Sequence, residues 1–125
     1  MKVDIVQHRN AKAICPTLYC GRQASFRRDW QSNMKLGNPH SIGRCKCGKT
    51  HSRAEAILAY EDDLLFQHRL PGHVKTIKYI AKRCIEQGYE HIQLSCFCAP
   101  KACHCRIIRR EVLREYQRLT ELNLT

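Results

Sequence analysis

The sequence predicts an α/β fold in which a small, mainly parallel sheet is flanked by helices and one polar loop is clamped by zinc. Residues 2–8 form a short β-branched run and residues 91–98 alternate polar and apolar side chains, as strands do, while helical patterns fill much of the chain between them. A helical connection between two strands favours parallel pairing. The 125 residues contain no repeat or low-complexity tract. We therefore expect one α/β domain over residues 1–125, with a metal-binding loop insertion at about 40–52.

After the first strand, the first half of the chain contains a second strand candidate, a long loop and a helix. Residues 17–21, "TLYCG", are a second strand candidate. Residues 23–52 are polar and have no clear periodicity, and loops of this length are usually functional or tied by a metal. A helix is expected over residues 52–69, because Ser52 is followed three residues later by Glu55 in the pattern of a capping box.

The second half of the chain repeats the helix–strand–helix order. The apolar spacing predicts a helix over residues 73–88 that ends at Gly88. The alternating run at 91–98 follows, and Pro100 ends this strand. The last helix is expected over residues 105–119. Ligand sites in parallel sheets lie beyond the carboxyl ends of the strands, where the segment after residue 95 falls.

The charge balance favours a polyanionic partner. The chain has 22 Lys and Arg residues against 11 Asp and Glu residues, a net charge of +11 with histidine neutral. We expect a nucleotide or nucleic acid partner, the alternative being a merely solvated basic surface. Arg106, Arg110 and Arg114 recur at four-residue spacing on one face of the last helix, which either faces water or meets phosphates.

The cysteine usage indicates metal or thiol chemistry rather than disulfides. The start "MKVDIVQHRN" lacks the apolar core of a signal peptide, and no apolar run approaches the length of a membrane span. We therefore expect a cytoplasmic protein without a membrane partner, in which the nine cysteines stay reduced. Six of them form three C-x-C pairs, a pattern that ordinary buried cysteines do not produce.

The segment "CKCGKTH" predicts a zinc site. Cys45, Cys47 and His51 lie within seven residues of a glycine-containing loop that has no apolar pattern. Soft sulfur and imidazole ligands at this spacing suit tetrahedral zinc. A fourth ligand is needed, and its candidates are Cys105, Cys20 and Cys15.

The segment "CFCAPKACHC" permits three interpretations. At the start of the last helix, Cys103 and His104 would face unpaired N–H groups, which lower a thiol pKa and attract anions. Together with Cys98 they are the predicted catalytic residues. Alternatively, the cysteines pack as small apolar side chains. In the third interpretation, Cys96, Cys98, Cys103 and Cys105 hold zinc or, less favoured, an iron–sulfur cluster, although C-x-C within a strand leaves little room to surround one ion.

One class of zinc enzyme is excluded by spacing. Zinc deaminases require H-x-E and P-C-x-x-C. Here His51 and Glu55 are separated by three residues, and Pro100 is followed by a lysine and an alanine before Cys103.

The order of these motifs resembles a known family, the domain of unknown function numbered 4326, which is common in phage and bacterial genomes. The resemblance rests on "LYCGR", "LGNP", "SRAEAILAYEDDL" and "LSCFCAPKACH" and runs from about residue 17 into the last helix. It implies a compact α/β fold with six residues gathered at one end, but no reaction. Those residues are Arg22, Asn38, Cys96, Cys98, Cys103 and His104.

The predicted roles of the site residues follow from their expected proximity at one end of the fold. Arg22, Asn38 and Arg106 are the predicted phosphate-binding residues. The "CKCGKTH" segment and Cys105 both depart from the usual family pattern, which makes Cys105 the favoured fourth zinc ligand. The predicted function is a zinc-binding basic protein that recognises phosphate groups and acts on or binds nucleotides or nucleic acid. The alternative is a non-catalytic, phage-type effector that docks on a host macromolecule such as a protein.

Overall fold

A small parallel sheet forms the centre of the fold. The computed structural model of the chain describes residues 1–7, 15–20, 36–96 and 102–124. Within these residues the sheet has the order β1-β5-β2, and both outer strands pair parallel to β5. This arrangement confirms the predicted α/β class. The strands are β1 (Lys2–Gln7), β2 (Thr17–Tyr19) and β5 (His91–Cys96).

The register of the sheet places its apolar side chains in the core. Val3 pairs with Ile92, and Leu18 pairs with Leu94. All four side chains are buried, and five consecutive residues of β5, from Ile92 to Cys96, are buried as well. A strand that is covered on both faces and both edges can carry such a run.

Three helices flank the sheet, and their ends follow local chemistry. They are α1 (Arg53–Leu65), α2 (Pro71–Gln87) and α3 (Cys105–Leu124). The Ser52 capping box is present as predicted. Helix α1 ends at Leu65, earlier than expected. Helix α2 also begins earlier than expected, because Pro71 starts this helix instead of only ending the one before it. Proline suits this first helical position, since its missing N–H has no partner there.

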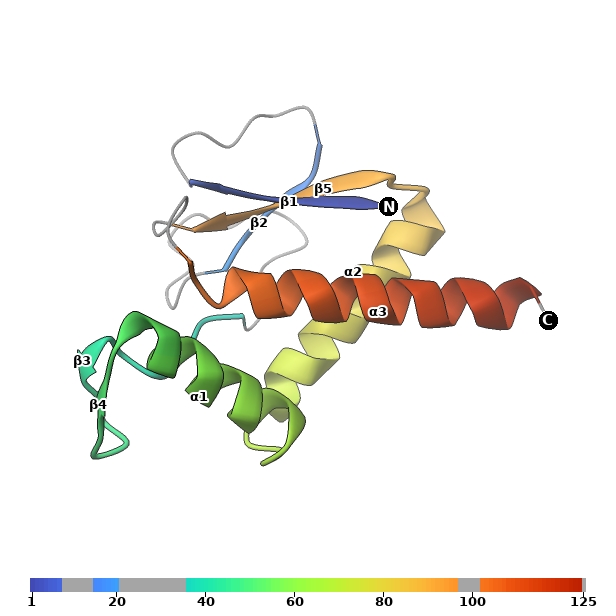
Figure 1. Cartoon of the computed structure of the whole chain (residues 1–125). Coiled ribbons are helices and arrows are strands. Elements are labelled where there is room, and N and C mark those ends of the chain that lie inside the picture. Colours follow the sequence, from blue (N-terminus) through green and yellow to red (C-terminus); the bar gives the residue numbers. More distant parts are fainter. Residues whose placement is uncertain (8–14, 21–35, 97–101, 125) are drawn as a thin grey trace.

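The long last helix covers the sheet. Helix α3 contacts β1 and β5 and packs against α2, which crosses it (Figure 1). Ile108 and Val112 on α3 are fully buried in this contact. No helix among the described residues is long and apolar enough to cross a membrane.

A small hairpin stands beside α1, at the opposite end of α1 from its junction with α2 (Figure 1). Its strands are β3 (Gly43–Arg44) and β4 (Thr50–His51), which pair antiparallel. We call residues 43–51 the metal hairpin. It runs directly into α1, since His51 is followed by the N-cap Ser52.

Candidate metal centre

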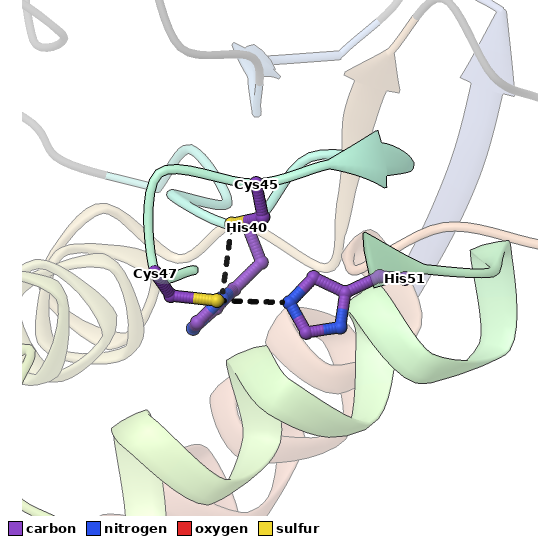
Figure 2. Close-up of side chains that lie close together, drawn as sticks. All are labelled: His40, Cys45, Cys47 and His51. Atoms are coloured by element: carbon purple, nitrogen blue, oxygen red, sulfur yellow. Dashed lines mark hydrogen bonds between the residues drawn. The ribbon is translucent and has the colours of Figure 1, made fainter. Parts of the chain in front are cut away.

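Two cysteines and two histidines converge at the metal hairpin. Their four ligand atoms all lie within 4.8 Å of one another. Nδ1 of His40 lies 3.6 Å from Sγ of Cys45, and Nε2 of His51 lies 3.2 Å from Sγ of Cys47. Figure 2 shows the two rings and the two sulfurs pointing toward one another. We call His40, Cys45, Cys47 and His51 the hairpin cluster.

The spacing of these atoms fits a tetrahedral ion. Zinc–nitrogen bonds of about 2.0 Å and zinc–sulfur bonds of about 2.3 Å place tetrahedral nitrogen and sulfur ligands about 3.5 Å apart. The two nitrogen–sulfur distances in the hairpin cluster are close to that value. Two thiols and two imidazoles are also a donor set typical of a closed metal site.

The backbone of the metal hairpin brings its cysteines together. The N–H of Cys45 donates to the Lys49 carbonyl, and the N–H of Gly48 donates to the Cys45 carbonyl, both at 3.0 Å. Gly48 has a φ of +92°, a conformation that glycine adopts without steric cost. Backbone N–H groups of Cys47 and Ser41 donate to the Cys45 sulfur and lower the pKa of its thiol to about 6. The turn is therefore arranged for a thiolate.

His40 is oriented by a carboxylate behind it. Its Nε2 lies 2.6 Å from Oδ2 of Asp63, a buried side chain of α1. Oδ1 of Asp63 lies 3.7 Å from the exposed guanidinium of Arg69. Burial alone would lower the pKa of His40, but its hydrogen bonds with Asp63 and Cys45 raise it. An imidazole that faces a metal with one nitrogen and a carboxylate with the other is the usual arrangement in metal sites.

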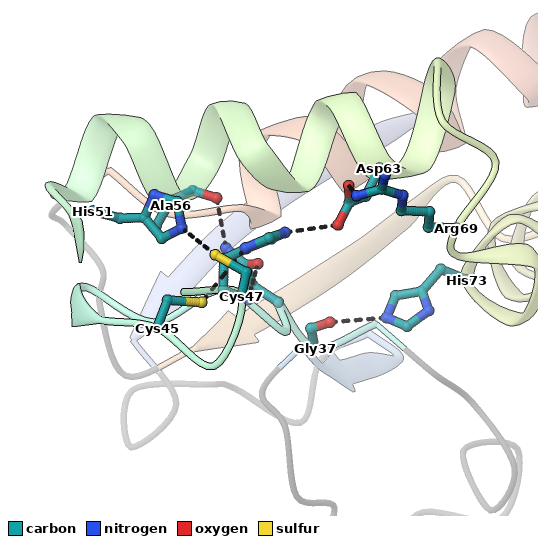
Figure 3. Close-up of polar contacts among 10 residues, drawn as sticks. Gly37, Cys45, Cys47, His51, Ala56, Asp63, Arg69 and His73 are labelled. Carbon is teal, nitrogen blue, oxygen red and sulfur yellow. Dashed lines mark hydrogen bonds and ion pairs between the residues drawn. The ribbon is translucent and has the colours of Figure 1, made fainter. Parts of the chain in front are cut away.

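Asn38 fixes the turn that carries His40. Its side-chain oxygen accepts a hydrogen bond from the His40 N–H at 2.9 Å, and its Nδ2 donates to the Ala56 carbonyl of α1 at 3.0 Å. Figure 3 shows Ala56 on the side of α1 that faces this loop. The sequence predicts phosphate binding by Asn38, but the residue is only 8% exposed and both ends of its amide are engaged. In the structure the residue positions a candidate metal ligand, and phosphate binding by Asn38 stays a prediction.

The loop is held at a second point. His73 Nε2, from α2, donates to the Gly37 carbonyl at 2.8 Å (Figure 3). Tyr60, which is fully buried on α1, donates its hydroxyl hydrogen to the Leu36 carbonyl at 3.2 Å. The "LGNP" motif thus lies against α1 and α2.

A second group of cysteines lies at the carboxyl end of β5. The sulfur atoms of Cys96, Cys103 and Cys105 lie within 4.8 Å of one another, and all three residues are buried. The sulfurs of Cys96 and Cys103 are 3.3 Å apart. We call these three residues the buried thiol cluster.

His104 faces away from solvent and toward the backbone. Its Nε2 donates to the Cys20 carbonyl at 2.6 Å, and its ring lies 5.0 Å from that of Tyr60, between ring centroids. Burial lowers the pKa of His104. The imidazole therefore packs against Tyr60 and provides a hydrogen bond to a backbone carbonyl at the end of β2.

Cys103 is not the exposed thiolate that its place near a helix start predicts. It is 4% exposed. Hydrogen bonding with Cys105 and Cys96, followed by burial, raises the pKa of its thiol, the opposite of the predicted direction. The buried neighbours outweigh the helix dipole, and the prediction of a catalytic role for Cys103 and His104 has no support in this geometry.

The comparison with known families agrees with the motifs. The family described as a domain of unknown function, DUF4326, matches residues 3–114. The chain belongs to this family. No curated protein and no solved structure matches it.

In this DUF4326 chain, the remaining predicted site residues are distributed as follows. Arg22 and Cys98 lie outside the described residues. Arg106 is exposed in the first turn of α3, and its side chain makes no hydrogen bond or ion pair with a described residue. Cys105 is the fourth ligand that the sequence favours beside Cys45, Cys47 and His51, but its sulfur lies in the buried thiol cluster. His40 takes its place.

The sequence does contain a signal for His40. In "HSIGRCKCGKTH", a histidine precedes the two cysteines by five and seven residues, and another follows four residues after Cys47. Four potential ligands within twelve residues form a complete tetrahedral set. The signal is easily missed, because His40 directly follows Pro39 and looks like part of a plain turn.

Proposed function

We propose that this DUF4326 chain is a zinc-clamped binding protein that recognises phosphate groups of nucleotides or nucleic acid through its metal hairpin. The observation that carries the proposal is the hairpin cluster, with four ligand atoms within 4.8 Å. Two sulfurs and two nitrogens are the donors of structural zinc sites. Four protein ligands leave zinc no open position for a substrate, so the ion would organise the loop rather than perform a reaction.

The surface of the metal hairpin is basic. Arg44, Lys46 and Lys49 are exposed, and none of their side chains makes an ion pair with a residue in the described part of the chain. No acidic residue occurs between His40 and Arg53. Two thiolates would neutralise a divalent ion, so the zinc-bound hairpin keeps the positive charge of these three side chains.

Two arginines of α3 in the described part of the chain are already paired with carboxylates. On α3, Arg110 pairs with Glu61 and Glu111, and Arg118 pairs with Glu115. Such pairing reduces the charge that these arginines offer to a phosphate. The metal hairpin is therefore the favoured place for phosphate contacts, with Arg106 as an additional one.

The metal part of this proposal is tested by elemental analysis. Cys47→Ala should lose one zinc ion per chain relative to the unmodified protein, because it removes one of four ligands. Cys84→Ala is the matched control, since Cys84 is buried on α2 and belongs to neither cysteine group. Its zinc content should not change. An unchanged zinc content in Cys47→Ala would show that the hairpin cluster does not hold the metal.

The phosphate part is tested by the salt dependence of binding to a short DNA duplex. Replacing Arg44, Lys46 and Lys49 together by glutamine should weaken binding, and the slope of log affinity against log salt should fall by about 0.9 for each phosphate that the variant no longer neutralises. The control replaces Lys75, Lys78 and Lys82 of α2, which removes the same charge from another surface.

Equal slopes in the two triple variants would contradict the assignment to the metal hairpin. Absence of DNA and nucleotide binding even at low salt would reject the phosphate function. The interaction protein named as the alternative would then be the function to pursue.

A further inference from the structure

We propose that Cys20, Cys96, Cys103 and Cys105 form a second, buried site for one thiophilic metal ion, with zinc as the expected occupant. The site lies at the carboxyl edge of the sheet and is separate from the hairpin cluster. Its donors are four sulfurs, whereas the hairpin cluster offers two sulfurs and two nitrogens. This inference does not depend on the proposed phosphate binding.

Three separate elements deliver these sulfurs to one place. Cys96 is the last residue of β5, and Cys105 is the first residue of α3. Cys103 lies two residues before that helix. The three sulfurs lie within 4.8 Å of one another, although Cys96 and Cys105 are nine positions apart in the sequence. Sulfur atoms bound to one tetrahedral zinc ion are about 3.8 Å apart, so the group already has nearly the right size.

Cys20 supplies the fourth sulfur. It directly follows β2, is fully buried and adjoins Cys105, outside the three sulfurs that lie within 4.8 Å of one another. Its backbone is fixed on both sides: the Cys20 N–H donates to the Ser95 carbonyl at 2.9 Å, and its carbonyl accepts from His104 at 2.6 Å. The sulfur itself lies 3.7 Å from the Leu18 carbonyl, a weak contact that a metal bond would replace.

Packing alone is a weaker account of this arrangement. Buried cysteines do serve as small apolar side chains, and Cys84 on α2 is an example. Apolar packing, however, does not require three sulfurs within 4.8 Å of one another, with those of Cys96 and Cys103 in contact at 3.3 Å. Coordination of one ion by several thiolates does require such convergence of sulfurs.

The ion would join the ends of two strands to the start of the last helix. Cys20 follows β2, Cys96 ends β5, and Cys105 begins α3. The ligands of a closed four-sulfur site are all protein atoms, so this ion would stabilise the fold and exclude water from the sheet edge.

Metal stoichiometry tests the proposal. The full chain, purified without oxygen in the presence of zinc, should contain two zinc ions. Cys103→Ser should contain one, Cys47→Ala should contain one, and the double variant none. The matched control Cys84→Ser should keep two. One ion in the unmodified chain that is lost in Cys47→Ala, or two ions in Cys103→Ser, would overturn the second site. If Cys47→Ala keeps two zinc ions while Cys103→Ser contains one, only the hairpin site is overturned.

Cadmium-113 spectroscopy of the unmodified chain provides a test that does not depend on the folding of a variant. Cadmium-loaded protein should give two resonances, one in the range of all-sulfur coordination and one in the range of mixed nitrogen and sulfur coordination. Absence of the all-sulfur resonance would overturn the proposal. A brown protein whose iron and labile sulfide are lost in Cys103→Ser would show a cluster instead of a single ion and would overturn it as well.

Discussion

At the scale of single residues, Asp63 is the side chain that gives the hairpin cluster its orientation. The carboxylate comes from α1, whereas His40 comes from the preceding loop, so their 2.6 Å contact fixes the ring against the helix. Carboxylates in this position raise the basicity of a metal-bound imidazole and hold its ring in place. The metal affinity of the hairpin should therefore depend on a residue that does not touch the ion.

Asp63→Asn should lower the affinity of the hairpin cluster for zinc by about 10- to 100-fold. The amide keeps the size of the side chain but loses the charge that polarises His40. Competition with a chromogenic chelator measures the affinity. Asp62→Asn is the control, because Asp62 is the exposed neighbour with the same charge. Equal affinities in the two variants would mean that Asp63 has only a structural role.

The residue scale is also where prediction from sequence is least successful. Cys45, Cys47 and His51 are close in the sequence, and the structure brings them together. The separation of Cys105 from Cys45 depends on where α3 starts relative to the sheet, which no local pattern encodes. The pKa of Cys103 depends on two neighbouring sulfurs, which an argument from the helix dipole does not include. The burial of Asn38 is not foreseen, because a buried amide and a phosphate ligand look alike in a sequence.

At the scale of elements, the start of α1 links helix formation to the metal hairpin. Ser52 accepts a hydrogen bond from the Glu55 N–H, and the Glu55 carboxylate accepts one from the Ser52 N–H. The Ser52 N–H, followed by its hydroxyl, lowers the pKa of Glu55. Since His51 directly precedes this cap, the same turn sets the direction of a candidate ligand.

Ser52→Ala should destabilise the protein by about 1 kcal/mol, the usual cost of losing an N-cap side chain. Denaturant unfolding of the zinc-bound protein measures the change. Ser52→Asp is the control, because aspartate also caps helices and should restore most of the stability. If both variants are equally unstable, the cap is not the cause.

Most elements are predictable because their signals are local. Periodicity and the capping box indicate α1, the glycine at position 88 indicates the end of α2, and alternation indicates β5. The exact boundary between α1 and α2 is not predictable, since Pro71 can either stop one helix or start the next. Strands β3 and β4 have two residues each and carry no periodic pattern.

At the scale of the whole molecule, the two cysteine groups lie in different parts of the fold. The hairpin cluster lies in a surface loop that lacks an apolar core, whereas the buried thiol cluster lies within the main core. The loop should therefore lose order when metal is removed, while most of the core remains packed.

Removing zinc from the hairpin with a chelator should speed hydrogen exchange at the amides of His40, Cys45 and Gly48. Their hydrogen bonds, to Asn38, Lys49 and Cys45, all lie within the loop that the ion would hold. Amides of β5 should stay protected, because they pair with β1 and β2. Exchange at the loop that is equally slow with and without zinc would show that the loop is stable by itself.

The order of strands in the sheet has a consequence for how the chain folds during synthesis. In the described sheet β1 and β2 do not pair with each other, and both pair with β5, so Val3 meets a partner that is made 89 residues later, Ile92. Pairing across such a separation is slow and must wait until β5 leaves the ribosome. The hairpin cluster needs only residues 40–51, and its four side chains can come together as soon as those residues emerge. The nascent chain would thus acquire its metal-bound turn before it has a sheet.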